Sequence, residues 1–211
     1  MATNYQALSG QDVIKKVRNT HIKYLIFCTL GVILAVVMLI AAGSMIRNGE
    51  GGILVMVFGV LVMLCSIYFA GRSFKTLGNI ENCRLFRKYG TPDEIAQRIS
   101  EGSLNTILDS KGSLCTDTFI MKHSDFESYV PYEDILLLYR KEHRTNGVLD
   151  GIYLVVHDRY GDKFEYPFKM GKKHAGEMDT VANAIGQRAK DCRFGYTPDN
   201  LSYVKQNAKT I

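Results

Sequence analysis

Two uncharged stretches decide the fold of this chain: YLIFCTLGVILAVVMLIAAGSMI at residues 24–46 and GGILVMVFGVLVMLCSIYFAG at residues 51–71. Only the four residues RNGE, at 47–50, separate them. A helix rises about 1.5 Å per residue, so about 20 residues cross a hydrocarbon core of about 30 Å. Both stretches reach that length without an internal charge. The pattern predicts a transmembrane hairpin with spans at 24–46 and 51–71.

The charges beside the spans predict how this hairpin is oriented. The connecting loop carries only Arg47 against Glu50, whereas basic residues gather at the other end of each span. By the positive-inside rule, the basic flanks face the cytoplasm and the loop faces outside. Basic residues are also attracted to an anionic leaflet, so the flanks are either inner-leaflet contacts or only determinants of topology. They are Lys15, Lys16, Arg18 and Lys23 before the first span, and Arg72 and Lys75 after the second.

We therefore expect a multi-pass protein of the cell membrane with both termini in the cytoplasm. A cleaved signal peptide is not expected, because the first apolar run begins only at residue 24 and is too long. Small residues lie four apart in both spans, at Gly31 with Ala35 and at Ser66 with Ala70. Such pairs favour close helix packing, either within the hairpin or between two hairpins. Neither span carries a charged side chain, which argues against an ion or proton pathway.

The remainder of the chain has the composition of one soluble domain. About 140 residues follow Arg72, which is enough for one compact core. The net charge of +5 is concentrated beside the spans, so it does not indicate a nucleic-acid partner. The cysteines form no CxxC pair and are expected to be free thiols in a reducing cytoplasm. They are Cys28, Cys65, Cys83, Cys115 and Cys192.

Local patterns predict a helix, then an antiparallel sheet, then a second helix. Thr91, Pro92 and Glu94 form a capping box at a helix start, and Gly102 is expected to end that helix. Alternating apolar residues then predict six strands. An amphipathic helix at 174–191 and a short tail with a Thr-Pro start at 197–198 follow. The six strands are expected at 105–108, 114–122, 127–131, 135–142, 151–158 and 163–168.

Several short strands followed by one amphipathic helix resemble a pleckstrin-homology-like (PH-like) domain. The run from Thr118, Phe119 and Ile120 to VPYEDI at residues 130–135 is similar to a strand-entry pattern of bacterial PH-like domains carried on membrane hairpins. The resemblance also covers the Gly-Thr-Pro at 90–92 and Gly195 with Tyr196. It implies a β-barrel plugged by its helix and brings no catalytic residue. A full barrel would have seven strands, so with six either one edge is open or the division into strands is wrong.

The predicted fold class is an α+β membrane protein: a two-helix transmembrane hairpin followed by a cytoplasmic, PH-like antiparallel β-barrel capped by a C-terminal amphipathic helix. Its expected parts are a basic N-terminal segment (1–23), the hairpin (24–71), a connector with a short helix (72–102), the PH-like domain (103–192) and a tail (193–211).

No catalytic, cofactor or metal motif is recognisable in the sequence. The histidines His123, His143, His157 and His174 are dispersed singly, without zinc-ligand spacing. Asp158 and Asp162 bracket a turn and are interpreted as turn formers rather than as an acid/base pair. The chain is therefore expected not to be an enzyme and to need no cofactor.

Two basic groups are candidate anion or lipid contacts. Lys172 and Lys173 precede the last predicted helix, where a helix N-terminus favours an anion, although the same residues also suit a solvated turn. Lys122, Arg140, Lys141 and Arg144 could form a basic rim on the barrel, of the kind that eukaryotic PH domains use for phosphoinositides. Acidic residues lie close to them in the sequence, which favours protein contact over anion capture.

Three functions remain open from the sequence. The first is an interaction or assembly module at the inner leaflet, with the bilayer and either a protein partner or a second copy as its partners. The second is sensing of anionic lipid headgroups by the PH-like domain. The third is an accessory subunit of a transporter or membrane enzyme.

Overall fold

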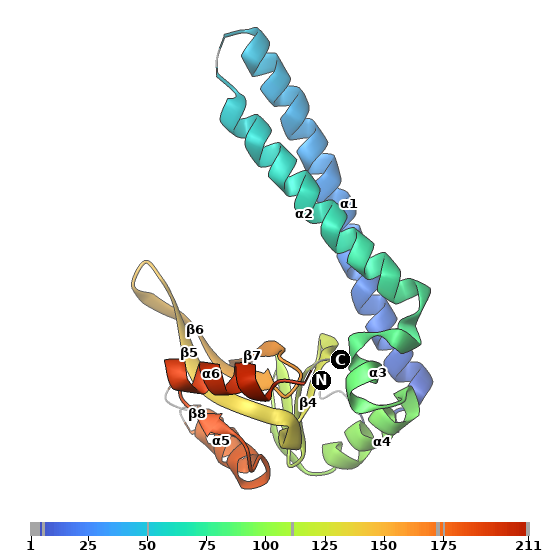
Figure 1. The fold of residues 1–211 in the computed structure, drawn as a ribbon, viewed down its shortest axis with the longest axis vertical. Helices are drawn as coiled ribbons and strands as arrows, with labels where there is room; N and C mark the ends of the chain where they lie inside the picture. The colour runs from blue at the N-terminus through green and yellow to red at the C-terminus, as the bar shows by residue number, and fades with distance from the viewer. Residues whose placement is uncertain are drawn as a thin grey trace. The chain divides into compact units, whose positions relative to one another are not determined.

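The chain is an α+β protein with two long apolar helices followed by two sheets (Figure 1). The structure is a computed structural model that describes Tyr5, residues 7–49, 51–110, 112–171, His174 and residues 176–209. It divides into two compact units. One is the helical hairpin, Lys15–Cys83, and the other, which we call the β domain, combines Met1–Ile14 with Arg84–Ile211. The segments 1–23 and 72–102 are thus each divided between the units.

The hairpin consists of α1 (Gly10–Arg47) and α2 (Ile53–Gly78), which run antiparallel (Figure 1). Small residues bring the two backbones together. The Cα of Gly31 faces the Ser66 hydroxyl, and a methyl group on Gly59 would lie 3.3 Å from the Leu39 side chain. Ala35 is fully buried between the helices. Packing within the hairpin, the first of the two uses predicted for these small residues, is therefore observed.

Both helices are long and apolar enough to cross a membrane. Only 11% of the most apolar part of α1 and 6% of that of α2 are buried. A core helix of a soluble protein would be mostly buried, whereas these helices expose large side chains such as Phe27, Ile40 and Leu54. Their outward faces therefore lack an apolar cover from the described part of the chain.

Two short helical turns and one capped helix connect the hairpin to the sheets. They are η1 (Ile80–Asn82), α3 (Arg84–Tyr89) and α4 (Pro92–Ser103). The predicted capping box is confirmed, because Thr91 Oγ1 accepts from Glu94 N–H and Glu94 Oε2 accepts from Thr91 N–H at 2.8 Å. The expected stop at Gly102 is wrong. The helix continues to Ser103, and Gly102 instead allows close approach, since a Cβ there would lie 2.7 Å from the Phe119 ring.

In the described part of the chain, eight strands form two four-stranded sheets. The first sheet has the order β1-β2-β3-β4, and its neighbours are antiparallel. The second has the order β7-β6-β5-β8, in which β8 runs parallel to β5. The strands are β1 (Thr106–Asp109), β2 (Ser113–Thr116), β3 (Phe119–Lys122), β4 (Asp125–Pro131), β5 (Ile135–Thr145), β6 (Val148–Asp158), β7 (Lys163–Phe168) and β8 (Arg193–Phe194).

The single strand predicted at 114–122 is wrong, because the chain reverses there between β2 and β3. Thr116 Oγ1 accepts hydrogen bonds from the backbone N–H groups of Thr118 and Phe119, both at 3.1 Å. A local hydroxyl-to-backbone bond of this kind competes with extension of a strand. Splitting this segment gives seven strands before the amphipathic helix, and β8, a short eighth strand, was not predicted.

The predicted closed barrel is not observed, since among the described strands no ladder joins the two sheets into one ring. Between β4 and β5 the chain makes the short helical turn η2 (Tyr132–Asp134), which interrupts strand pairing. At the other side, β2 and β7 are linked by a side chain, as Ser113 Oγ donates to the Pro167 carbonyl at 3.4 Å.

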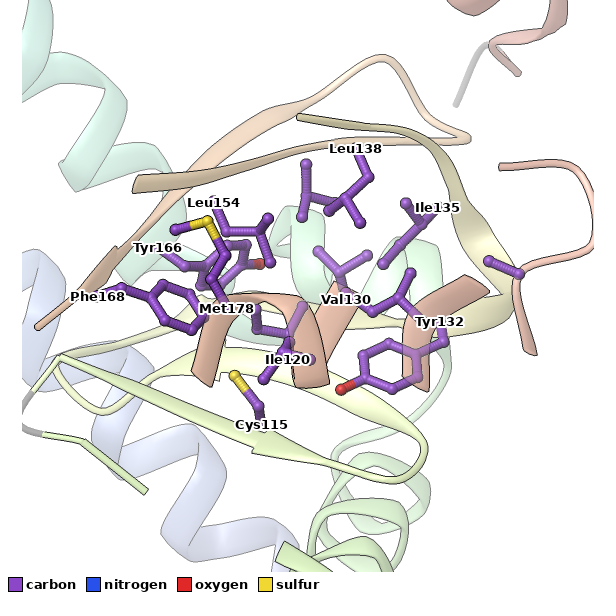
Figure 2. Close-up of a cluster of buried hydrophobic side chains, with 14 residues drawn as sticks. Cys115, Ile120, Val130, Tyr132, Ile135, Leu138, Leu154, Tyr166, Phe168 and Met178 are labelled. Atoms are coloured by element: carbon purple, nitrogen blue, oxygen red, sulfur yellow. The ribbon is translucent and has the colours of Figure 1, made fainter. Parts of the chain in front are cut away.

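One core lies between the sheets and α5 (Glu177–Arg188). Figure 2 shows side chains from both sheets and Met178 of α5 directed into it. The predicted apolar stripe is confirmed, because all its members belong to this core. They are Met178, Val181, Ala182, Ile185 and Ala189.

The predicted Thr-Pro start of the tail is also confirmed. Thr197 Oγ1 accepts from Asn200 N–H at 3.2 Å, and α6 (Pro198–Asn207) follows. Leu201 and Val204 of α6 pack with Leu136 and Leu137 of β5. The tail therefore belongs to the β domain.

Candidate functional site

The predicted basic rim is not assembled as one surface. Lys122 ends β3 in the first sheet, whereas Arg140 and Lys141 lie in β5 of the second. Because successive strand residues point to opposite faces, Arg140 and Lys141 do not share a face. Lys172 and Lys173 lie outside the described residues.

Carboxylates pair with the basic residues Arg140, Lys141 and Arg144 of β5. Arg140 pairs with Glu142 at 2.8 Å, and Glu142 also pairs with Arg144 at 3.0 Å. The two guanidinium groups lower the pKa of Glu142, which keeps it ionised. Lys141 pairs with Glu165 at 2.8 Å. Glu142 is shared by Arg140 and Arg144, and Glu165 is shared by Lys141 and Lys163, so these basic residues are paired but only partly compensated.

Apart from Arg47 at the loop, the basic residues of α1 and α2 lie at one end of the hairpin. Lys23 stands eight residues before Gly31, and Lys75 stands nine residues after Ser66. Since Gly31 and Ser66 are packed together in antiparallel helices, Lys23 and Lys75 are level with each other. Lys15, Lys16 and Arg18 extend this end along α1, and Arg72 lies one turn inward on α2.

The most densely bonded charged group is a buried cluster around Lys88, which we call the Lys88 cluster. The Lys88 side chain is 2% exposed and that of Asp158 is 0% exposed. Lys88 Nζ donates to Asp158 Oδ2 and, at 2.5 Å, to Asp162 Oδ2. The Tyr89 hydroxyl donates to Asp158 Oδ2 at 3.0 Å, and Arg84 pairs with Asp162 at 2.5 Å. Three elements, α3, β6 and the β6–β7 turn, are joined by these bonds.

Aromatic rings complete the cluster. Lys88 Nζ lies 5.3 Å from the ring centre of Tyr160 and 5.6 Å from those of Tyr89 and Phe164. A cation is attracted to ring faces at such distances. Burial raises the pKa of the Tyr89 phenol far above its usual range, and the Asp158 carboxylate raises it further, so this phenol stays protonated and donates to Asp158.

The sequence pattern missed this cluster, although Asp158 was correctly interpreted as a turn former. Asp158 Oδ1 accepts from the N–H groups of Tyr160 and Asp162, at 3.0 and 2.7 Å. The overlooked signal is periodicity. Leu154 and Val156 alternate into the core, and Asp158 is the next residue on that buried face. A carboxylate there requires a buried cationic or donor partner.

A chain of hydrogen bonds, which we call the relay, joins Asp109, His123 and Tyr5. His123 Nε2 lies 2.8 Å from Asp109 Oδ1, and His123 Nδ1 lies 2.9 Å from the Tyr5 hydroxyl. The connectivity is that of a nucleophile, base and orienting carboxylate. Tyr5, however, is only 3% exposed and its ring stacks on that of His123. A substrate has no access to this hydroxyl, so the relay holds the N-terminal segment in place.

A polar cleft of about 330 Å³ lies where the end of α4 meets the β2–β3 turn and β4. Burial raises the pKa of Tyr129 in this cleft to about 12, against the opposing effect of Arg98. Within the described residues no group of His, Cys, Asp and Glu could hold a metal ion. The cleft is lined by Arg98, Glu101, Gly102, Asn105, Asp117, Thr118, Tyr129, Pro131 and Glu133.

Comparison of the chain with protein-family models, with curated proteins and with solved structures finds no match. The PH-like resemblance therefore depends on the motifs and on the order of elements.

Proposed function

We propose that this protein is a non-enzymatic, multi-pass membrane protein that presents a PH-like β domain at the inner leaflet as an interaction or assembly module. The observation that carries the proposal is the exposure of the apolar faces of α1 and α2. Large apolar side chains on two adjacent helices are costly in water, and lipid is the environment that removes this cost.

The β domain is built from segments on both sides of the hairpin, which supports placing both termini on one side of the membrane. Residues before the hairpin and residues after it belong to the same compact unit. A chain that crosses a bilayer twice returns to the side from which it started, as this shared unit requires. The basic residues at one end of the hairpin favour the cytoplasm for that side.

The order of elements supports the PH-like assignment. Four antiparallel strands, three further antiparallel strands and one helix across the core are the parts that the resemblance implies. The β domain departs from these parts in two places. The turn η2 lies between β4 and β5, which are in different sheets, and β8 is an additional strand.

Labelling of cysteines placed in the loop and in the β domain tests the topology. Asn48→Cys should react with a membrane-impermeant maleimide on intact cells, whereas Lys190→Cys should react only after permeabilisation. The parent chain, whose own thiols are present in both variants, gives the background. Labelling of Lys190→Cys on intact cells, or equal labelling of both positions, would refute the topology.

Crosslinking of the full chain in membranes tests the interaction role. We expect a discrete oligomer or a reproducible crosslink to one partner through the β domain. A strictly monomeric protein without any partner would overturn the assembly role.

Lipid sensing is the alternative, and the pairing of Arg140 and Lys141 with carboxylates gives it less support. The full chain in nanodiscs with and without anionic lipid separates the two functions. Hydrogen exchange in β5 should be the same in both. Protection that appears only with anionic lipid would favour lipid sensing instead.

A further inference from the structure

The β domain holds the chain on both sides of the hairpin, although nearly 70 residues separate the two points in sequence. On the downstream side the grip is α3, which directly follows the hairpin unit. Lys88 of α3 is bonded to Asp158 and Asp162, and the Tyr160 hydroxyl donates to the Lys88 carbonyl at 3.0 Å. We call these contacts the downstream grip.

On the upstream side the grip is the N-terminal segment up to the start of α1. The Tyr5 ring lies between His123 and Phe126, with ring centres at 5.9 and 6.0 Å. Two backbone groups add to it, since Leu8 N–H donates to Ser100 Oγ at 3.2 Å and Gly10 N–H to Asp93 Oδ1 at 3.1 Å. We call these contacts the upstream grip.

Gly10 shows how closely the upstream grip is fitted. A Cβ at this position would lie 2.9 Å from the backbone nitrogen of Asp93, closer than side chains normally approach. Gly10 is also the first residue of α1, the helix that continues into the hairpin. The start of α1 is therefore seated directly on the N-terminal turn of α4.

We propose that the β domain is a clasp, whose two grips fix the near ends of α1 and α2 with respect to each other, and that the upstream grip is the one that opens. The two grips differ in kind. The downstream grip is a buried ion cluster, which is lost only when several charges lose their partners together. The contacts named for the upstream grip come from one aromatic side chain and from single hydrogen bonds, and contacts of this kind open locally at lower cost.

The clasp does not depend on what the β domain binds. A failure to find a partner would refute the interaction role and leave the clasp unaffected.

The test uses the full chain in nanodiscs, with spin labels attached through unnatural amino acids because five native cysteines are present. One label pair, at Arg18 and Lys75, reports on the near ends of α1 and α2. A control pair, at Arg47 and Leu54, reports on the loop end of the hairpin. Tyr5→Ala opens the upstream grip, and Tyr196→Ala, at an exposed tyrosine, is the matched control variant.

In the unaltered chain the amides of Leu8 and Gly10 should be protected from hydrogen exchange. Tyr5→Ala should make them exchange about tenfold faster or more. It should also broaden the Arg18–Lys75 distance distribution without altering the control pair. Tyr196→Ala should change none of these.

Two results would overturn the clasp. One is exchange of Leu8 and Gly10 in the unaltered chain at the rate of an unstructured peptide. The other is an unchanged Arg18–Lys75 distribution when Tyr5→Ala has released those amides. If Tyr5→Ala fails to fold, Ser100→Ala can replace it, because it removes one hydrogen bond of the upstream grip. The hydrogen exchange of the Leu8 amide and the Arg18–Lys75 distance distribution are then measured in this variant and interpreted in the same way.

Discussion

Replacing Lys88 by methionine tests how the β domain holds α3. The side chain keeps its length and apolar stem but loses the ammonium group. Asp158, which is fully buried, then retains the Tyr89 hydroxyl and two backbone N–H donors but has no opposite charge in contact. Asp162 keeps its pairing with Arg84. The variant thus leaves the buried Asp158 carboxylate without a counter-charge.

The expected loss of stability follows from the uncompensated charge of Asp158. Removing one partner of a buried ion pair costs about 3–5 kcal/mol, because the other charge is left without compensation in a poorly solvating interior. For a chain of this size, 1 kcal/mol shifts the unfolding midpoint by about 2–4 °C. We therefore expect Lys88→Met to lower the midpoint by about 6–20 °C.

Removal of the second charge should recover part of this loss. Asp158→Asn keeps an oxygen for the N–H groups of Tyr160 and Asp162, and it removes the negative charge. Replacing both members of a buried pair by uncharged groups is often neutral. Lys88→Met with Asp158→Asn should therefore be more stable than Lys88→Met alone.

The assay is thermal unfolding of the full chain in detergent, followed by circular dichroism and tyrosine fluorescence, because the chain has 12 tyrosines and no tryptophan. Lys190→Met, at an exposed lysine, is the matched control and should shift the midpoint by no more than about 1–2 °C. A Lys88→Met midpoint equal to that of Lys190→Met would refute the reasoning. A double variant less stable than Lys88→Met would refute the explanation that the uncompensated charge of Asp158 causes the loss of stability.

Three further predictions concern the β domain. Gly102→Ala should destabilise it by about 1–3 kcal/mol in denaturant titration, since the added methyl group would overlap the Phe119 ring; an unchanged midpoint would contradict this packing. Burial, together with the nearby charge of Lys163, lowers the pKa of His157 below its usual 6.5. Near pH 6.5 the unfolded state therefore binds more protons than the folded state, and the stability of the fold should decrease as the pH is lowered through this value. His157→Gln should reduce that fall, and identical pH profiles would exclude this cause. Burial raises the pKa of Cys192 to about 12, so alkylation at pH 8 should be far slower in the folded than in the unfolded chain, as mass spectrometry can measure.

The sequence predicted those elements whose signals are local. The capping box at Thr91 and the Thr-Pro start at Thr197 are settled by residues three positions apart, and both were found where expected. The apolar stripe of α5 depends only on helical periodicity. The β2–β3 turn was missed because Asp117, its one turn-forming residue, stands without a glycine or proline in a continuous run of strand-forming residues. A threonine hydroxyl reverses the chain there, and threonine is equally common within strands.

The site was less predictable, because its contacts join residues far apart in sequence. Lys88 falls in the segment predicted only as a connector with a short helix (72–102), and nothing near it in sequence indicates a partner 70 residues away. The same holds for Tyr5, whose partner His123 lies 118 residues further on. Conversely, the basic rim was predicted from the resemblance to PH domains, whereas strand alternation separates Arg140 from Lys141.

The discontinuous β domain also constrains the order in which the chain assembles. If the connection between Tyr5 and His123 were unstructured, closing it would cost about 4 kcal/mol in chain entropy. The hairpin removes much of that cost, because antiparallel helices return the chain to the end from which it left. The N-terminal segment is synthesised first but finds its partners on α4 and in the first sheet, which come after both helices. We therefore expect the hairpin to form before the upstream grip closes, and defects in the contact between Gly31 and Ser66 should weaken the binding of Tyr5 while leaving the two sheets unchanged.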